Sequence, residues 1–128
     1  MNEPGLTYDT GALIAAERNN RLMWALHRAA LTRGITPTVP AGSLGEVWRG
    51  SQQHHLSRML KGCRIEDFTK TQAKQVGVMI GQSGLNDIVD VAVVEGALRR
   101  NDAVVTSNRS HIAQVANAMN RHIEIYDA

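Results

Sequence analysis

Strand-like and helix-like segments alternate along the whole chain. Strands separated by helices favour a parallel sheet covered by helices on both faces, because parallel neighbours need a crossover connection. We therefore predict an α/β fold with about five parallel strands. The predicted strands are Leu6–Asp9, Ile35–Val39, Arg64–Glu66, Ala103–Thr106 and His122–Tyr126. The predicted helices are Gly11–Glu17, Asn20–Thr32, Pro40–Arg49, Gln52–Lys61, Thr71–Gln82, Asp87–Arg100 and Arg109–Met119.

The length and composition fit one folded unit. The chain has 128 residues, of which 43% are hydrophobic, enough for one core and too few for two ordinary domains. We predict a single domain over residues 1–128. No run of about eighteen apolar residues occurs, and Met1–Pro4 lacks the basic and then apolar pattern of a signal peptide. We therefore expect a cytoplasmic protein that does not enter a membrane.

An acidic residue follows the first predicted strand. Leu6 to Tyr8 read as a short buried strand, and Asp9 stands where the chain turns into a helix. In open α/β sheets, ligands bind outside the carboxyl ends of the strands. Asp9 is therefore a candidate ligand-binding residue.

Two more acids begin the predicted helix Asp87–Arg100. Asp87 and Asp90 fall on one face of this helix. Like charges this close repel each other unless a cation lies between them, which indicates a metal site. The alternative is structural, with Asp87 as the helix cap and Asp90 as a first-turn acid favoured by the helix dipole.

A further acid lies in the predicted helix Pro40–Arg49. Its apolar face includes Leu44, Val47 and Trp48, and Glu46 lies off that face. Taken alone, Glu46 reads equally well as a solvated surface residue. As a third acid, it strengthens the interpretation of a metal site.

Three motifs, in this order, resemble the PIN domain and, within it, the VapC-type toxins of bacterial toxin–antitoxin pairs. They are LTYDTGALIA at 6–15, SLGEVWRG at 43–50 and NDIVDVAVVEGALRRNDAVVTSNRSHI at 86–112. The resemblance extends from Leu6 to Tyr126. It implies a PIN-like fold and Mg²⁺- or Mn²⁺-dependent RNA cleavage, with Asp9, Glu46 and Asp90 as catalytic metal ligands. It also implies a VapB-like antitoxin as partner and a homodimer.

The motif after the fourth predicted strand departs from the family. Where relatives often carry a fourth acid, this chain has Asn108 and His111. An asparagine can bind Mg²⁺ through its amide oxygen but brings no negative charge. We expect Asp87 to supply that charge as a fourth catalytic ligand. Thr10 and Asn108 are expected to hold the carboxylates and bound waters in place.

Basic residues are concentrated in one half of the chain. The net charge is only +2, but Glu17–Arg64 holds eight basic and two acidic residues, a net charge of +6. Basic residues near an acidic metal cluster suit a phosphodiester substrate, because they bind the phosphate backbone. Arg49, Ser107 and His111 are the candidate substrate contacts. For any single arginine, a solvated surface position is the alternative.

The other reactive side chains indicate no second site. The histidines lack a zinc-binding spacing, and the only cysteine excludes an internal disulfide. We interpret that cysteine, Cys63, as a small packed residue rather than a nucleophile, because an apolar residue, Ile65, follows closely.

The predicted helix Asn20–Thr32 has apolar residues on two sides. One side holds Leu22, Met23, Leu26, Ala29 and Ala30. Trp24 and Leu31 lie opposite. Either the same chain covers Trp24 and Leu31, or they form an exposed docking patch for an antitoxin or a second copy.

These observations predict a metal-dependent endoribonuclease, the toxin of a VapBC-type pair, that cleaves RNA phosphodiesters with a metal-activated water. Two alternatives remain open. One is a PIN-like protein that has lost catalysis and binds RNA or a partner. The other is a phosphate-transfer receiver domain, although its acidic pair beside the first strand and its strand-end lysine are missing.

Overall fold

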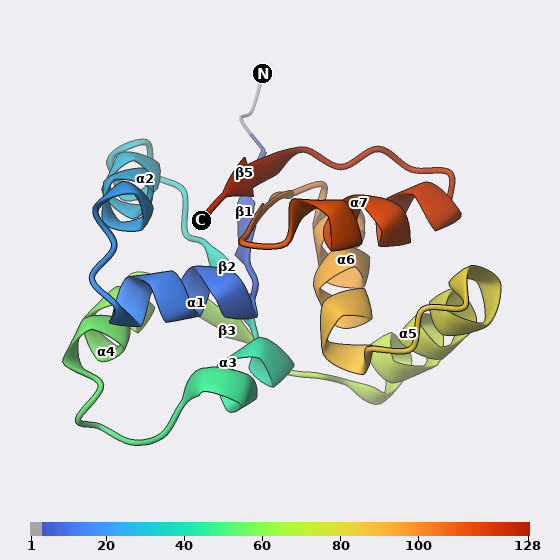
Figure 1. The fold of residues 1–128 in the computed structure, drawn as a ribbon, viewed down its shortest axis with the longest axis horizontal. Helices are drawn as coiled ribbons and strands as arrows, with labels where there is room; N and C mark the ends of the chain where they lie inside the picture. Colours follow the sequence, from blue (N-terminus) through green and yellow to red (C-terminus); the bar gives the residue numbers. More distant parts are fainter. Residues whose placement is uncertain (1–3) are drawn as a thin grey trace.

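The computed structural model describes residues 4–128, and its strands form one parallel sheet in the order β3-β2-β1-β4-β5 (Figure 1). The strands are β1 Leu6–Tyr8, β2 Thr38–Pro40, β3 Arg64–Glu66, β4 Ala103–Thr106 and β5 Ile125–Asp127. The helices are α1 Thr10–Glu17, α2 Arg21–Thr32, α3 Ala41–Val47, α4 His54–Leu60, α5 Lys70–Ser83, α6 Ile88–Arg100 and α7 Arg109–Ala118. Residues 1–3 lie outside the described range, and they include part of the segment Met1–Pro4 on which the expectation about a signal peptide was based.

Helices cover both faces of the sheet, as predicted. In Figure 1, α1, α2 and α4 lie on one side of the strands, and α5, α6 and α7 lie on the other. The strand side chains follow the same division, since successive residues of a strand point to opposite faces. Leu6 and Tyr8 pack with the α1, α2 and α4 side, whereas Val104 packs with the α5, α6 and α7 side. Helix α6 is buried from Val91 to Ala97, so it packs against neighbours on most of its surface.

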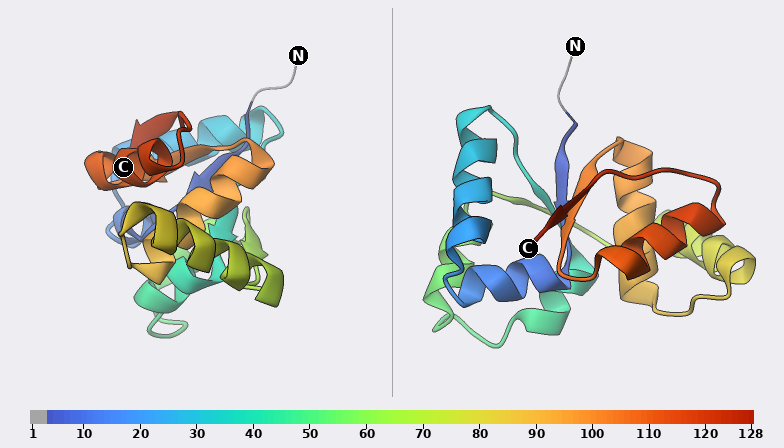
Figure 2. Two further views of the ribbon diagram at one scale, coloured as in Figure 1. Left: turned by 90° about the vertical axis from the view of Figure 1, so that its right-hand side faces the viewer. Right: turned by 45° about the horizontal axis from the view of Figure 1, so that its top comes forward.

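The pairing of the strands brings several loops to one edge of the sheet. β1 lies in the middle, between β2 and β4. Tyr8, the last residue of β1, is level with Val105 of β4. The chain therefore leaves β1 at Asp9 and β4 at Ser107 beside each other. The two views in Figure 2 show α1 and α3 starting at this carboxyl edge, where α6 also begins.

The observed elements follow the predicted order, with shifts at their ends. β2 begins at Thr38 rather than Ile35, and β5 begins at Ile125 rather than His122. The third helix ends at Val47, because Trp48 takes an extended conformation with ψ of 128°. The receiver-domain alternative is wrong, since that flavodoxin-like fold has the strand order 2-1-3-4-5. Within residues 4–128, no helix combines the length and apolar character required to cross a bilayer.

Candidate metal centre

Asp9 forms the one-residue junction between β1 and α1. It is buried, and its Oδ1 accepts a hydrogen bond of 3.0 Å from the amide of Ala12, so it caps the helix. Burial raises the pKa of the Asp9 carboxyl. Hydrogen bonds from Thr106 and from the Ala12 and Gly11 amides lower this pKa in part. The negative charge of Glu46 raises it further. A carboxylate is thus held at the carboxyl end of the central strand.

Thr10 connects this junction to α3. Its Oγ1 donates a hydrogen bond of 2.6 Å to Oε1 of Glu46. Glu46 itself is exposed. The predicted supporting residue and one predicted metal ligand are therefore in direct contact, and Glu46 is turned toward the Asp9 junction.

Asp90 lies in the first turn of α6, beside His111 of α7. Its Oδ2 is 3.2 Å from Nδ1 of His111. Burial raises the pKa of the Asp90 carboxyl, and the charges of Asp87, Asp9 and Glu46 raise it too, while His111 lowers it. The other three predicted acids therefore all act on the Asp90 carboxyl group.

Asp87 has the structural role that was its alternative interpretation. It is the N-cap of α6, and its Oδ1 accepts a hydrogen bond of 3.1 Å from the amide of Asp90. The side chain is exposed. Capping occupies one carboxylate oxygen of Asp87. Its role as a metal ligand stays a prediction, and the other carboxylate oxygen would bind the metal.

The turn after β4 packs tightly on the turn after β1. A Cβ placed on Gly11 would lie 2.8 Å from Cβ of Ser107, closer than real contacts allow, and 3.0 Å from the Ser107 backbone nitrogen. Gly11 is therefore required for this approach. Asn108 is exposed, and its backbone N–H donates a hydrogen bond of 2.8 Å to Oγ1 of Thr106. Ser107 thus lies against the turn that follows Asp9, and Asn108 follows it in the chain. Their roles as substrate contact and supporting residue stay predictions.

Within residues 4–128, no three His, Cys, Asp or Glu side chains lie close enough together to form a ready-made metal site. Each predicted ligand has its own partner: Asp9 and Asp87 face helix amides, Glu46 faces Thr10, and Asp90 faces His111. The donor set nevertheless fits a hard divalent cation. Its oxygen ligands are of the preferred type. The pKa values of Asp9 and Asp90 are raised mainly by burial, and repulsion from the neighbouring acids raises them further, a contribution that a bound cation would offset.

The guanidinium group of Arg49 is bound to the end of α3. Its Nη1 donates to the Trp48 carbonyl at 2.8 Å, and its Nη2 donates to the Glu46 carbonyl at 3.0 Å. These contacts satisfy the helix carbonyls, which is a common use of arginine at a C-terminus. Its role as a substrate contact stays a prediction.

The interpretation of Trp24 and Leu31 as an exposed docking patch is wrong for Trp24. Trp24 is only 8% exposed, its Nε1 donates to the Ala16 carbonyl at 3.1 Å, and its ring meets the His27 ring edge-on. Leu31 is 41% exposed, and Leu22, which belongs to the apolar side opposite Trp24 and Leu31, is 79% exposed. The inward side of α2 is formed by Met23, Trp24, His27 and Ala30. His27 is tolerated there because Tyr8 Oη lies 2.9 Å from its Nδ1.

Cys63 is half-buried, and its Sγ donates to the Met59 carbonyl at 3.4 Å. Burial raises the pKa of the thiol to about 12, which leaves little thiolate at neutral pH. This supports the interpretation of Cys63 as a packed residue.

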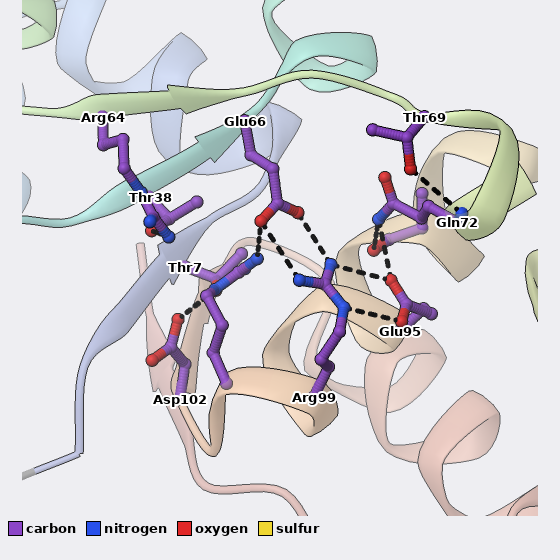
Figure 3. A network of polar contacts seen from close by, with 11 residues as sticks. Thr7, Thr38, Arg64, Glu66, Thr69, Gln72, Glu95, Arg99 and Asp102 are labelled. Carbon is purple, nitrogen blue, oxygen red and sulfur yellow. Dashed lines mark hydrogen bonds and ion pairs between the residues drawn. The ribbon is translucent and has the colours of Figure 1, made fainter.

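A polar network between β3 and α6 was not predicted (Figure 3). Arg99 contacts Glu66 at 2.8 Å and Glu95 at 3.0 Å, and Gln72 of α5 donates to Glu95 at 2.8 Å. Arg100 lies 2.7 Å from the same Glu66 carboxylate. These two arginines lower the pKa of Glu66 to about 2. The i, i+4 spacing of Glu95 and Arg99 is the only part visible in the sequence.

The sequence matches no family model and no curated protein. The structure, however, resembles solved ones. VapBC2 from Rickettsia felis, bound to a DNA fragment from their promoter, has a TM-score of 0.66 and 14% identity over 96% of this chain and 98% of that one. A toxin–antitoxin complex from Klebsiella pneumoniae has a TM-score of 0.65 and 19% sequence identity, over 85% of this chain and 91% of that one. PAE2754 from Pyrobaculum aerophilum has a TM-score of 0.64 and 14% sequence identity, over 97% of this chain and 83% of that one. The predicted PIN-like α/β fold is therefore confirmed, over nearly the whole chain.

Proposed function

We propose that this chain, as a single PIN-like domain over residues 1–128, is a metal-dependent endoribonuclease of the VapC type. The observation that carries the proposal is the electrostatic coupling at Asp90. Its carboxyl group lies in the field of Asp9, Glu46 and Asp87, although these acids come from three separate segments. Acids near the carboxyl edge of a parallel sheet suit a ligand site, and the repulsion between their charges suits a cation.

Asp9, Glu46 and Asp90 would hold Mg²⁺ or Mn²⁺, with Asp87 as a fourth ligand. When bound, such a cation lowers the pKa of a coordinated water and neutralises charge on the phosphate of RNA. Thr10 orients Glu46 through its hydroxyl hydrogen bond.

His111 holds Asp90 from the other side, and Ser107 and Asn108 line the neighbouring turn. We propose that His111 and Ser107 contact the substrate beside the acids, supported by the His111–Asp90 contact and by the proximity of Ser107 to Gly11. We retain Arg49 as a third substrate contact, supported by its position next to Glu46.

We further propose a VapB-like antitoxin and a second copy of the chain as partners, and a cytoplasmic location. The K. pneumoniae structure, described as a toxin–antitoxin complex, and the R. felis VapBC2 structure support the first partner by likeness of fold.

The alternative is a PIN-like protein without catalysis that binds RNA or a partner. Two features favour it: Asn108 brings no charge where relatives often have an acid, and the acids are partnered separately. RNA incubated with the protein, with and without Mn²⁺, separates the two functions. We expect Mn²⁺-dependent cleavage that Asp90→Asn reduces about a hundredfold or more, the scale for losing one strong electrostatic contact in a transition state. Binding without cleavage in the unmodified protein would favour the alternative.

A further inference from the structure

An open groove lies between α2 and α4, on the side of the molecule where α1 ends (Figure 1). It has a volume of about 540 Å³, and three arginines line it: Arg21 and Arg28 of α2 and Arg58 of α4. In the described part of the chain, no carboxylate lines this groove. We refer to it as the arginine groove.

The charges in the arginine groove are not compensated. Among residues 4–128, neither Arg21 nor Arg28 forms an ion pair with a carboxylate. Arg99, Arg100 and Arg109, elsewhere on the surface, are all paired with acids. Three of the eight basic residues in the positively charged half of the sequence therefore lie together in this groove.

Arg58 is held in place before any ligand arrives. Its Cζ lies 4.4 Å from the centre of the Trp24 ring, a cation–π contact. Trp24 is fixed in turn by its hydrogen bond to the Ala16 carbonyl. A guanidinium ordered in this way loses less conformational freedom when it binds an anion.

We infer that the arginine groove binds the phosphate backbone of the RNA strand on one side of the cleavage position. Helix α1 leads from Asp9 to the groove and, with eight residues, is about 12 Å long. A few nucleotides would span that distance. Arg21 and Arg28 are seven residues apart on one helix, about 10 Å, so they would contact separate phosphates. This inference rests on the proposed nuclease function.

An acidic protein segment is the competing ligand for the same charges. Protein interfaces gain most of their affinity from aromatic and apolar anchors that enter well-packed pockets. The aromatic residue of the arginine groove, Trp24, is buried and already covered by Arg58. The exposed large apolar side chain of the groove, Leu22, is outnumbered by the three arginines. This excess of charge favours a flexible polyanion, whose affinity comes from counterion release.

The test measures binding of a short fluorescent oligouridine in EDTA, over a series of KCl concentrations. Both arginines are exposed, so R21Q/R28Q should fold normally. We expect this variant to weaken binding about tenfold and to reduce the slope of log Kd against log salt by about 1.4, since each phosphate contact on a single strand contributes about 0.7. K70Q/K74Q on α5 removes the same charge from another surface and should leave both values unchanged.

Equal losses in the two variants would overturn the inference, because net charge alone would then explain binding. Poly-glutamate tests the acidic protein segment as the alternative ligand. The inference would be overturned if poly-glutamate displaced oligouridine, bound more tightly than the RNA, and lost affinity only in R21Q/R28Q. Because EDTA prevents metal-dependent cleavage, this result is independent of the nuclease assay. A protein that cleaves RNA but binds it without the arginine groove would refute this inference alone.

Discussion

Thr10 Oγ1 and Glu46 Oε1 are joined by a hydrogen bond of 2.6 Å, which links the residue after Asp9 to a helix that begins after a different strand. The contact orients an otherwise exposed glutamate toward the acid at the end of β1. A carboxylate on a surface helix would otherwise sample several rotamers. The hydroxyl group thus contributes to the order of the acidic cluster.

Replacement of Thr10 tests this role. Thr10→Val keeps the shape of the side chain but removes the donor, and we expect metal affinity and RNA cleavage to fall about 10- to 100-fold, the range for loss of a group that orients a ligand. Thr10→Ser should retain most of both. Calorimetry with Mn²⁺ and a cleavage assay give the two values, and equal behaviour of the valine and serine variants would show that the hydroxyl is not needed.

Gly11 allows the turns after β1 and β4 to touch. Gly11→Ala would place a methyl group against Ser107, and we expect a loss of about 1–3 kcal/mol in unfolding free energy together with reduced cleavage, because the Asp9 junction must move. Gly77→Ala is the matched control. Gly77 lies in α5 with no atom within 4 Å of an added Cβ, so stability should rise by about 0.5–1 kcal/mol. Urea denaturation measures both, and a neutral Gly11→Ala would argue against the close approach.

Trp24 is expected to matter for stability. Trp24→Ala removes a buried ring together with its hydrogen bond to Ala16 and its contact with Arg58, and should cost about 3–5 kcal/mol. Leu31→Ala on the same helix removes a partly exposed side chain and should cost much less. A Trp24→Ala protein as stable as the unmodified one would return Trp24 to the surface and restore the docking interpretation.

Acid should weaken the fold through Glu66. Arg99 and Arg100 lower the pKa of Glu66 from 4.5 to about 2, so between these values the unfolded chain takes up a proton that the folded chain does not. The stabilising effect of this carboxylate is complete above about pH 4.5 and is lost as the pH falls toward 2. Glu66→Gln should lower stability at neutral pH by about 1–3 kcal/mol, the scale for hydrogen bonds to a charged group. The difference between the two proteins, followed by denaturation from pH 7 to 2.5, should shrink in acid, and a constant difference would contradict the assignment.

Much of the fold was predictable because the order of strands and helices is set by local periodicity. Asp9, Thr10 and Glu46 could also be placed, since motifs at strand ends meet at one edge of a parallel sheet. The buried side of α2 could not be predicted, because both sides of the helix carry large apolar residues. Tyr8 and Arg58, which are distant in sequence, decide that Trp24 and His27 face inward. The pairing of Arg99 with Glu66 of β3 could not be predicted either, because it depends on where the edge strand β3 lies relative to α6.

The binding of Mn²⁺ to the unmodified protein, Asp90→Asn and Glu124→Gln tests the central claim most directly. Glu124 precedes β5, outside the predicted cluster, and serves as the control carboxylate. We predict that the unmodified protein and Glu124→Gln bind Mn²⁺ alike, and that Asp90→Asn, which removes a charge coupled to Asp9, Glu46 and Asp87, binds it at least about tenfold more weakly. Absence of Mn²⁺ binding in the unmodified protein, or equal binding by all three, would contradict the claim that these acids form a metal centre.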